Sequence, residues 1–167
     1  GEDFIIASNN IHKLSDLFAQ SDLIFCLDFN HLNRCGDELS NCIRNCNAEQ
    51  FVIDHHTYPE HFSSYEIIDS NASSTCELIF TLIKDNQDEK LIDKSIAEAI
   101  YTGLVTDTGS FKFSSASSYT HEVASKLMLT GFDHAKVQQS INDQNSISRL
   151  EHFKKCLKFD PAVFLKN

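Results

Sequence analysis

Apolar residues in the first half of the chain fall into short continuous runs, and the segments between them have helical periodicity. We predict four strands, at residues 4–7, 23–27, 51–53 and, more weakly, 65–68. Continuous apolar runs are typical of parallel strands that are buried on both faces. After the first run, Ser8 begins a polar helix-start signal, and Leu14, Leu17 and Phe18 share one helical face. This pattern predicts a mostly parallel sheet with helices on both faces.

From Asn71 onward the pattern becomes helical. The apolar stripe of an amphipathic helix occurs at Cys76, Ile79, Phe80 and Ile83. A second helix is predicted from about Asp93 and leads into a tight turn at Gly109. Further helices are predicted near 118–130, 133–141 and 146–157. The fold class is therefore α/β, with a mostly parallel sheet followed by a helical segment.

Size and charge limit the possible partners. The chain has 167 residues and a net charge of −10. Proteins that hold long nucleic acid through its phosphates usually carry a basic face, so we expect no long duplex as a partner. Any anionic ligand is expected to be small or held through metal ions. No apolar run approaches the ~20 residues that span a bilayer, so we expect a soluble, cytoplasmic protein without a membrane partner.

The six cysteines form no CxxC pair. Cys42 and Cys46 have the i, i+4 spacing of a helix and, together with Cys35, suggest a zinc site as one alternative. No second close pair completes four ligands, so reduced structural thiols are the preferred interpretation.

Candidate chemistry lies where the apolar segments end. Asp28 and Asp54 end predicted strands, and Asp107 follows a predicted helix. His55 and His56 come directly after Asp54. Each aspartate taken alone is often only a turn or helix-capping residue. In open parallel sheets, however, ligands bind beyond the carboxyl ends of the strands, so we expect these groups to converge.

Carboxylates and imidazoles without thiolates suit Mn²⁺ or Mg²⁺, and imidazole favours Mn²⁺. Asp28, at a rigid strand end, is the natural bridge between two ions, and His55 and Asp107 would complete the shell of one ion. Two ions about 3.5–4 Å apart can hold a hydroxide nucleophile and neutralise a phosphate during in-line displacement. Since side chains alternate along a strand, we expect one histidine to bind an ion and the other to reach a phosphoryl oxygen.

Three motifs of the sequence resemble those of the DHH phosphoesterases. They are the stretches 27–30 (LDFN), 52–56 (VIDHH) and 103–111 (GLVTDTGSF). Within that superfamily the chain looks most like the oligoribonuclease/pAp-phosphatase branch. The resemblance covers roughly residues 4–157, with the motifs in the same order and at similar spacing.

The resemblance implies a role for each candidate residue. It makes Asp28 a bridge between two Mn²⁺ ions and makes His55 and Asp107 metal ligands. His56 would contact the scissile phosphate, and Asp54 would orient a neighbouring histidine, as metal-binding imidazoles generally require. Arg34 is a weaker candidate for assisting at the phosphate, because it is equally compatible with a surface position.

The sequence departs from the family pattern at two places. The family's first motif, a histidine followed by two close aspartates on the first strand, is absent, as is the smaller C-terminal substrate domain. We expect residues 1–157 to form the DHH-type domain without its first strand, and 158–167 to begin the linker to the absent domain. A missing strand leaves backbone groups unpaired, so residues upstream of Gly1 are the preferred source, ahead of a strand from another chain or a sheet that has closed up differently. For the printed chain we expect little activity and weak metal affinity.

The expected function of the intact protein is Mn²⁺-dependent hydrolysis of short single-stranded oligonucleotides or 3′,5′-bisphosphorylated nucleotides. A non-catalytic nucleotide-binding or interaction module is the main alternative. An inorganic pyrophosphatase or a cyclic dinucleotide phosphodiesterase has less support from the motifs. The sequence leaves open whether the protein forms a homodimer.

Overall fold

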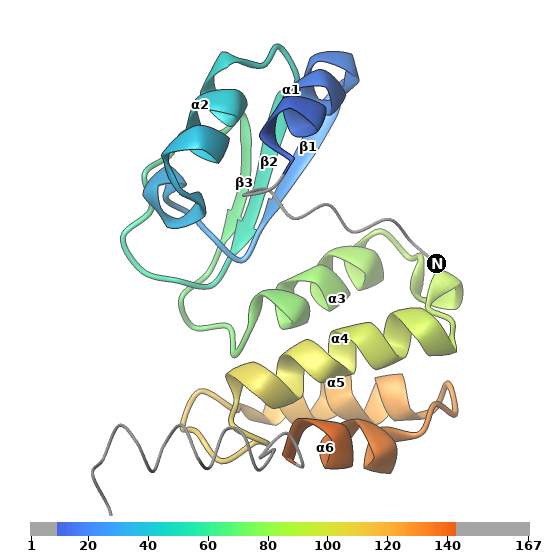
Figure 1. Ribbon diagram of the computed structural model, residues 1–167. Helices are drawn as coiled ribbons and strands as arrows, with labels where there is room; N and C mark the ends of the chain where they lie inside the picture. Colours follow the sequence, from blue (N-terminus) through green and yellow to red (C-terminus); the bar gives the residue numbers. More distant parts are fainter. Residues whose placement is uncertain (1–9, 143–167) are drawn as a thin grey trace, which may run out of the picture. The chain divides into compact units, whose positions relative to one another are not determined.

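The computed structural model describes residues 10–142. The chain divides into two compact units, residues 1–132 and 133–167. In chain order the first unit contains α1 (Ile11–Gln20), β1 (Leu23–Leu27), η2 (Leu32–Cys35), α2 (Asp37–Asn45), β2 (Glu49–Asp54), β3 (Tyr65–Ile68), α3 (Thr75–Asp85), η3 (Glu89–Leu91), α4 (Lys94–Asp107) and α5 (Ser118–Met128) (Figure 1). The second unit contains α6 (His134–Asn142).

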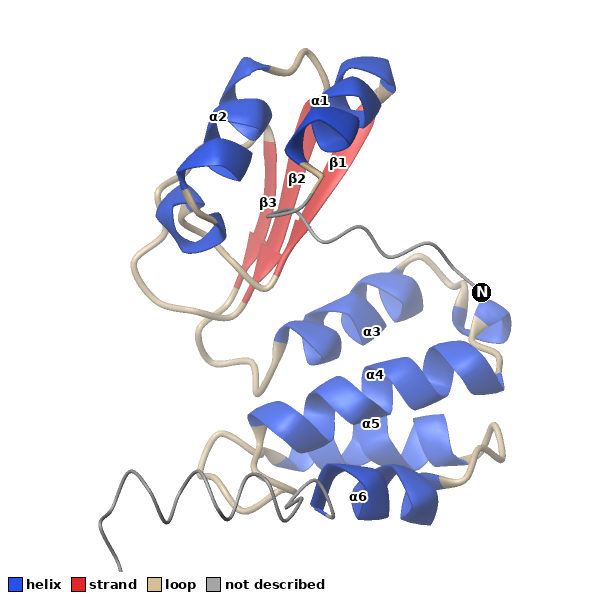
Figure 2. Cartoon of the chain, viewed as in Figure 1, coloured by secondary structure: helices blue, strands red, loops and turns tan. Residues whose placement is uncertain are grey.

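The three strands form one parallel sheet in the order β1-β2-β3 (Figure 2). Leu27 pairs with Ile53, and Asp54 pairs with Ile68, so the strands end close to one another at the same edge. The backbone N–H of Asp28 donates to the carbonyl oxygen of Ile53 at 3.1 Å and extends this pairing by one residue. The predicted parallel sheet is confirmed, and its carboxyl edge carries Asp28 and Asp54.

Helices cover both faces of the sheet, as the apolar runs predicted. Helices α1 and α2 lie side by side over one face of the sheet (Figure 1), and Cys26 and Val52, which are paired in the sheet, are buried. On the opposite face, Ile53 forms a buried cluster with Ala72 and with Leu78 of α3. Through this cluster, α3 packs against the central strand β2.

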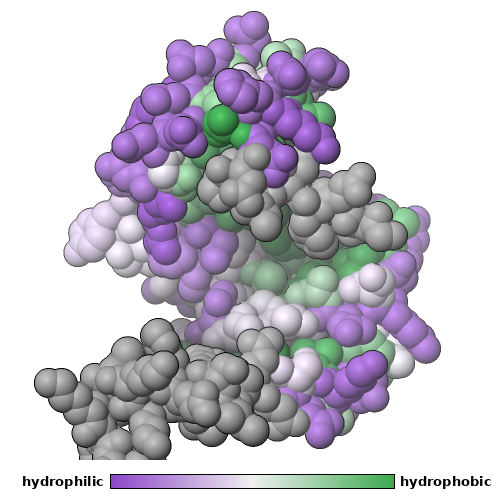
Figure 3. All heavy atoms as spheres, viewed as in Figure 1, coloured by the Kyte–Doolittle hydropathy of each residue, from purple (hydrophilic) through white to green (hydrophobic). Residues whose placement is uncertain are grey.

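The surface of the chain is uneven in polarity. Hydrophilic residues cover α1 and α2 on the face shown in Figure 3, whereas hydrophobic residues are visible over α3. An aromatic row crosses the sheet on its α3 side, with ring centroids 5.4 Å apart for Phe25 and Phe51 and 6.0 Å apart for Phe51 and Tyr65. Phe25 and Tyr65 remain exposed, so α3 covers only part of that face.

The predicted strand bounds agree closely with the structure. Strands 23–27 and 65–68 have the predicted limits, and the run at 51–53 extends to Glu49–Asp54. The strand predicted at 4–7, the helix at 146–157 and the domain boundary after residue 157 lie outside the described residues.

Side-chain caps set the starts of the central helices. Ser74, Asp93 and Ser117 each accept a hydrogen bond from a backbone N–H in the first turn of α3, α4 and α5. The stretch predicted to turn helical from Asn71 contains the actual cap, Ser74, and α3 itself begins at Thr75. Asp69 accepts hydrogen bonds from the backbone and side chain of Asn71, which holds that segment in a turn before the helix.

The described cysteines are free thiols. Burial, and then the neighbouring Cys35 and Cys46, raise the pKa of Cys26 to about 11. Within residues 10–142, no group of close candidate metal ligands contains a cysteine. In the same part of the chain, no helix has both the length and the apolar character needed to cross a membrane.

Candidate metal centre

Asp28 follows β1 in an uncommon backbone conformation. Its φ is +67°, in the left-handed region that aspartate tolerates better than most residues other than glycine. Its carboxylate atom Oδ1 accepts a hydrogen bond of 2.8 Å from the hydroxyl of Thr75. The backbone turn and this contact together direct the Asp28 carboxylate from the end of β1 toward the start of α3.

Asp54 is the last residue of β2, and its side chain is completely buried. Oδ1 of Asp54 lies 2.7 Å from Nδ1 of His56, and Oδ2 accepts from the backbone N–H of His56 at 3.2 Å. An ionised carboxylate can only accept hydrogen bonds, so opposite an ionised Asp54 the Nδ1 atom of His56 is the donor of this pair and Nε2 faces away from it. Asp54 therefore orients His56.

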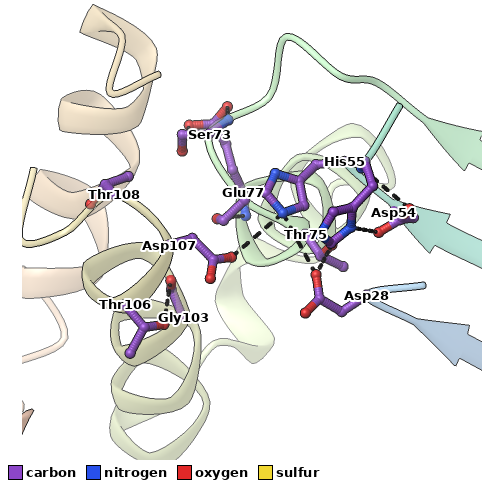
Figure 4. Close-up of polar contacts among 12 residues, drawn as sticks. Asp28, Asp54, His55, Ser73, Thr75, Glu77, Gly103, Thr106, Asp107 and Thr108 are labelled. Atoms are coloured by element: carbon purple, nitrogen blue, oxygen red, sulfur yellow. Dashed lines mark hydrogen bonds and ion pairs between the residues drawn. The ribbon is translucent and has the colours of Figure 1, made fainter. Parts of the chain in front are cut away.

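His55 lies between two carboxylates from distant parts of the chain. Its Nε2 atom is 3.7 Å from Oδ1 of Asp28 and 3.9 Å from Oδ2 of Asp107 (Figure 4). Asp107 is the last residue of α4, whereas the sequence pattern placed it after that helix. The edge of the sheet and the C-terminal end of α4 thus meet at His55, as expected.

Asp28, His55 and His56 form a compact group whose candidate ligand atoms all lie within 4.8 Å of one another. Ligands of one Mg²⁺-sized ion stand at most about 4.2 Å apart, so only small movements are needed to hold an ion. The expectation that the two histidines point in different directions was wrong. Strand β2 ends at Asp54, so the alternation of a strand does not apply to the next two residues, and their ring centroids lie 4.6 Å apart.

The electrostatics of the centre favour a cation. Burial, and then the charge of Asp28, raise the pKa of Asp107, while His55 and His56 lower it. Two carboxylates therefore repel each other across the His55 ring, and a positive ion between them would relieve that repulsion. Oxygen and imidazole ligands without thiolates suit Mn²⁺ or Mg²⁺. The residues present fit such an ion, although Asp107 lies outside the compact group of three.

A close contact between α3 and α4 determines where Asp107 lies. A β-carbon added at Gly103 would be 2.1 Å from Sγ and 2.9 Å from Cβ of Cys76, so only glycine allows this approach. Asp107 follows one helical turn after Gly103. Burial, followed by the charges of Asp107 and Asp28, raises the pKa of the Cys76 thiol to about 11. Cys76 therefore lies under the centre as a neutral packing group.

Residues 3–104 match the family model described as DHH family, N-terminal domain, which covers more than half of the chain. The chain belongs to the DHH family. The matched segment includes Asp28 and the Asp54–His56 triplet and ends three residues before Asp107. The resemblance inferred from the sequence motifs is confirmed.

Known proteins of similar sequence include relatives of this DHH chain in bacteria. The uncharacterized protein MG371 of Mycoplasma genitalium is 33% identical over 128 residues, which are 77% of this chain and 38% of its own. A Streptococcus mutans protein named probable bifunctional oligoribonuclease and PAP phosphatase NrnA is 30% identical over 130 residues, 77% of this chain and 40% of its own. The chain thus spans less than half the length of these relatives.

The fold also matches a solved structure. An exopolyphosphatase-related protein from Bacteroides fragilis aligns with a TM-score of 0.86 and 35% sequence identity, over 93% of this chain and 46% of that protein. The α/β architecture predicted from the apolar runs is therefore that of a DHH protein.

Two residues that contact the DHH centre were not predicted as site residues. The buried Asn30 donates from Nδ2 to the carbonyl oxygen of His56 at 2.7 Å, and Thr75 donates to Asp28. Asn30 lies in the LDFN motif two residues after Asp28, which was an available signal. Thr75 begins the helix after the third strand, so its position near the carboxyl edge of the sheet could have been inferred from the topology.

Arg34 is placed differently from the other candidates. It lies in η2 with an exposed side chain, and its backbone N–H donates to the carbonyl oxygen of His31 at 3.0 Å. Among the described residues, it forms no ion pair with Asp28, Asp54 or Asp107. The structure therefore adds no support for a role at the phosphate.

Proposed function

We propose that the intact protein is a Mn²⁺-dependent phosphoesterase that hydrolyses short single-stranded oligonucleotides or 3′,5′-bisphosphorylated nucleotides. The observation that carries the proposal is that Nε2 of His55 lies 3.7 Å from Asp28 and 3.9 Å from Asp107 at the carboxyl edge of the sheet, with His56 grouped closely with Asp28 and His55. Membership of the DHH family, and the oligoribonuclease and PAP phosphatase named in Streptococcus mutans, support the substrate class.

In this proposal Asp28, His55 and Asp107 hold the ions, two in the intact protein, with Mg²⁺ as a substitute for Mn²⁺. When bound, such ions neutralise the phosphate and supply a nucleophile from water at neutral pH. Asp28 comes from the rigid end of β1 and offers two oxygens, which suits a bridging position. Asp107, on the last turn of α4, approaches the same Nε2 atom of His55 as Asp28 does.

His56 is assigned to the scissile phosphate. Asp54 fixes the ring through Nδ1, so the opposite nitrogen, Nε2, is left for the substrate. In its doubly protonated form, the ring donates from Nε2 to a phosphoryl oxygen while Nδ1 stays on Asp54. Asn30 holds the backbone carbonyl of the same residue, which limits the movement of His56 as charge develops on the phosphate.

The test measures Mn²⁺ binding by calorimetry and hydrolysis of a 5′-labelled dinucleotide and of adenosine 3′,5′-bisphosphate by the intact protein. Asp28→Ala and His55→Ala should each lower the rate by orders of magnitude and weaken Mn²⁺ binding, while circular dichroism stays unchanged. Asp16→Ala and His12→Ala, two exposed positions on α1, remove the same side-chain types as matched controls.

His56→Asn separates the two histidine roles. This variant should keep most of the Mn²⁺ affinity and lose turnover, because the proposal assigns His56 to the phosphate. Near-normal rates in Asp28→Ala or His55→Ala would contradict the proposal. Nucleotide binding that needs no Mn²⁺ and leads to no turnover would instead favour the non-catalytic nucleotide-binding module.

A further inference from the structure

The hydroxyl of Thr75 makes a hydrogen bond to the carboxylate of Asp28 across 47 positions of the chain, with Oγ1 2.8 Å from Oδ1 (Figure 4). The two partners differ greatly in exposure. Thr75 is only 4% exposed, whereas the Asp28 side chain is 56% exposed. A fixed, buried donor therefore holds a carboxylate that would otherwise be free to rotate in solvent.

Thr75 is fixed because a buried network surrounds the first turn of α3. The carboxylate of Glu77 accepts from the hydroxyl of Ser73 at 2.7 Å, from the backbone N–H of Ser73 at 3.2 Å and from the hydroxyl of Thr120 at 2.6 Å. Ser74 caps the same turn by accepting from the backbone N–H of Glu77. The start of α3 is thereby tied to α5, and the Thr75 hydroxyl has little freedom to move.

The contact selects one orientation of Asp28. Oδ1 accepts from Thr75 and also lies 3.7 Å from Nε2 of His55, so the bond keeps the carboxylate facing the imidazole. Each carboxylate oxygen has two lone pairs, so one pair on Oδ1 and both pairs on Oδ2 remain for other partners. A hydroxyl donor can therefore orient Asp28 without preventing it from binding an ion.

We propose that Thr75 is a positioning residue, anchored by Glu77, that holds the Asp28 carboxylate in the orientation needed for metal binding. This inference rests on the proposed function, because it takes Asp28 to be a metal ligand. Thr75 acts only through Asp28 and contacts no substrate. Loss of comparable partners behind metal ligands typically lowers metal affinity or activity about 10- to 100-fold.

The experiment compares Thr75→Val, which has nearly the same shape but no hydroxyl, with Thr75→Ser, which keeps the hydroxyl. In the intact protein, Thr75→Val should weaken Mn²⁺ binding about 10- to 100-fold. Turnover at saturating Mn²⁺ should fall less than turnover at low Mn²⁺, and Thr75→Ser should behave like the wild type. Thr102→Val is the matched control, because the Thr102 hydroxyl donates to the carbonyl oxygen of Glu98 in its own helix.

A second measurement needs neither metal nor activity. Side-chain scalar couplings in NMR spectra of the metal-free protein report the χ1 rotamer of Asp28. We expect one dominant rotamer in the wild type and in Thr75→Ser, and averaging among rotamers in Thr75→Val. An unchanged single rotamer in Thr75→Val, or loss of affinity in Thr75→Ser equal to that in Thr75→Val, would overturn the inference. A wild-type protein that binds no Mn²⁺ but shows the expected rotamer change would overturn the proposed function instead.

Discussion

Nδ1 of His56 lies 2.7 Å from Oδ1 of Asp54, a carboxylate with no exposed surface. The other oxygen of Asp54 accepts from the backbone N–H of His56. One buried carboxylate thus fixes both the ring and the backbone of His56, which lies two residues after the end of β2. Such a group is stable in the interior only while both of its donors stay in place.

Asp54→Asn should destabilise the protein and disturb His56. The amide nitrogen of asparagine is a donor, so one of the two N–H groups of His56 would lose its acceptor. We expect the free energy of unfolding to fall by about 1–3 kcal/mol in urea denaturation. Nitrogen NMR of His56 should show a single Nδ1–H tautomer in the wild type and a mixture in the variant. An unchanged tautomer would contradict the orienting role of Asp54.

Gly103→Ala should force α3 and α4 apart. The Sγ atom of Cys76 can rotate away from the new methyl group, but its Cβ atom, at 2.9 Å, cannot. We expect a loss of about 1–3 kcal/mol in unfolding free energy, as for other overpacked contacts. The double variant Gly103→Ala/Cys76→Gly should lose less than the sum of the single variants, because glycine at position 76 removes both the Sγ and the Cβ contact. Strict additivity would show that the contact does not limit the helix spacing.

Glu77→Gln should destabilise the turn that carries Thr75. Three donors from Ser73 and Thr120 point at the two oxygens of Glu77, and glutamine offers only one acceptor oxygen. We expect about 1–3 kcal/mol of destabilisation in thermal or urea unfolding. Glu98→Gln, on the exposed side of α4, is the matched control and should leave stability nearly unchanged. Equal stability of Glu77→Gln and the wild type would contradict this account of the network.

Glu60→Gln should change how stability depends on pH. Hydrogen bonds from the Arg44 side chain and the Leu32 backbone lower the pKa of Glu60 from its ordinary value of 4.5. A carboxylate whose pKa is lower in the folded state stabilises the protein above pH 4.5, and this stabilisation is lost as the pH falls through the folded-state pKa.

Urea unfolding of the wild type and Glu60→Gln at a series of pH values measures this effect. The difference in unfolding free energy should be largest at neutral pH and should shrink below pH 4.5. Glu38→Gln, an exposed position on α2, serves as the control for general charge effects. A difference that stays constant with pH would show that the ionised form of Glu60 contributes nothing specific.

The sequence alone determined the strands, most of the helices and the positions of the candidate ligands. Continuous apolar runs predicted β1 and β2, and a weaker run predicted β3, although three of the five residues of β1 are exposed in the structure. The same runs placed Asp28 and Asp54 at strand ends, because a polar residue ends a buried segment. These are local features, in which neighbouring residues fix both the backbone conformation and the face that is buried.

Only the tertiary structure decided how the distant groups meet. The contact of Thr75 with Asp28 depends on how α3 packs on the sheet, and the approach of Asp107 to His55 depends on how α4 packs on α3, which Gly103 and Cys76 set by shape. The common direction of His55 and His56 depends on where β2 stops. Such contacts join residues far apart in the chain or beyond the end of a strand. Local periodicity does not encode them, because they arise from packing between elements.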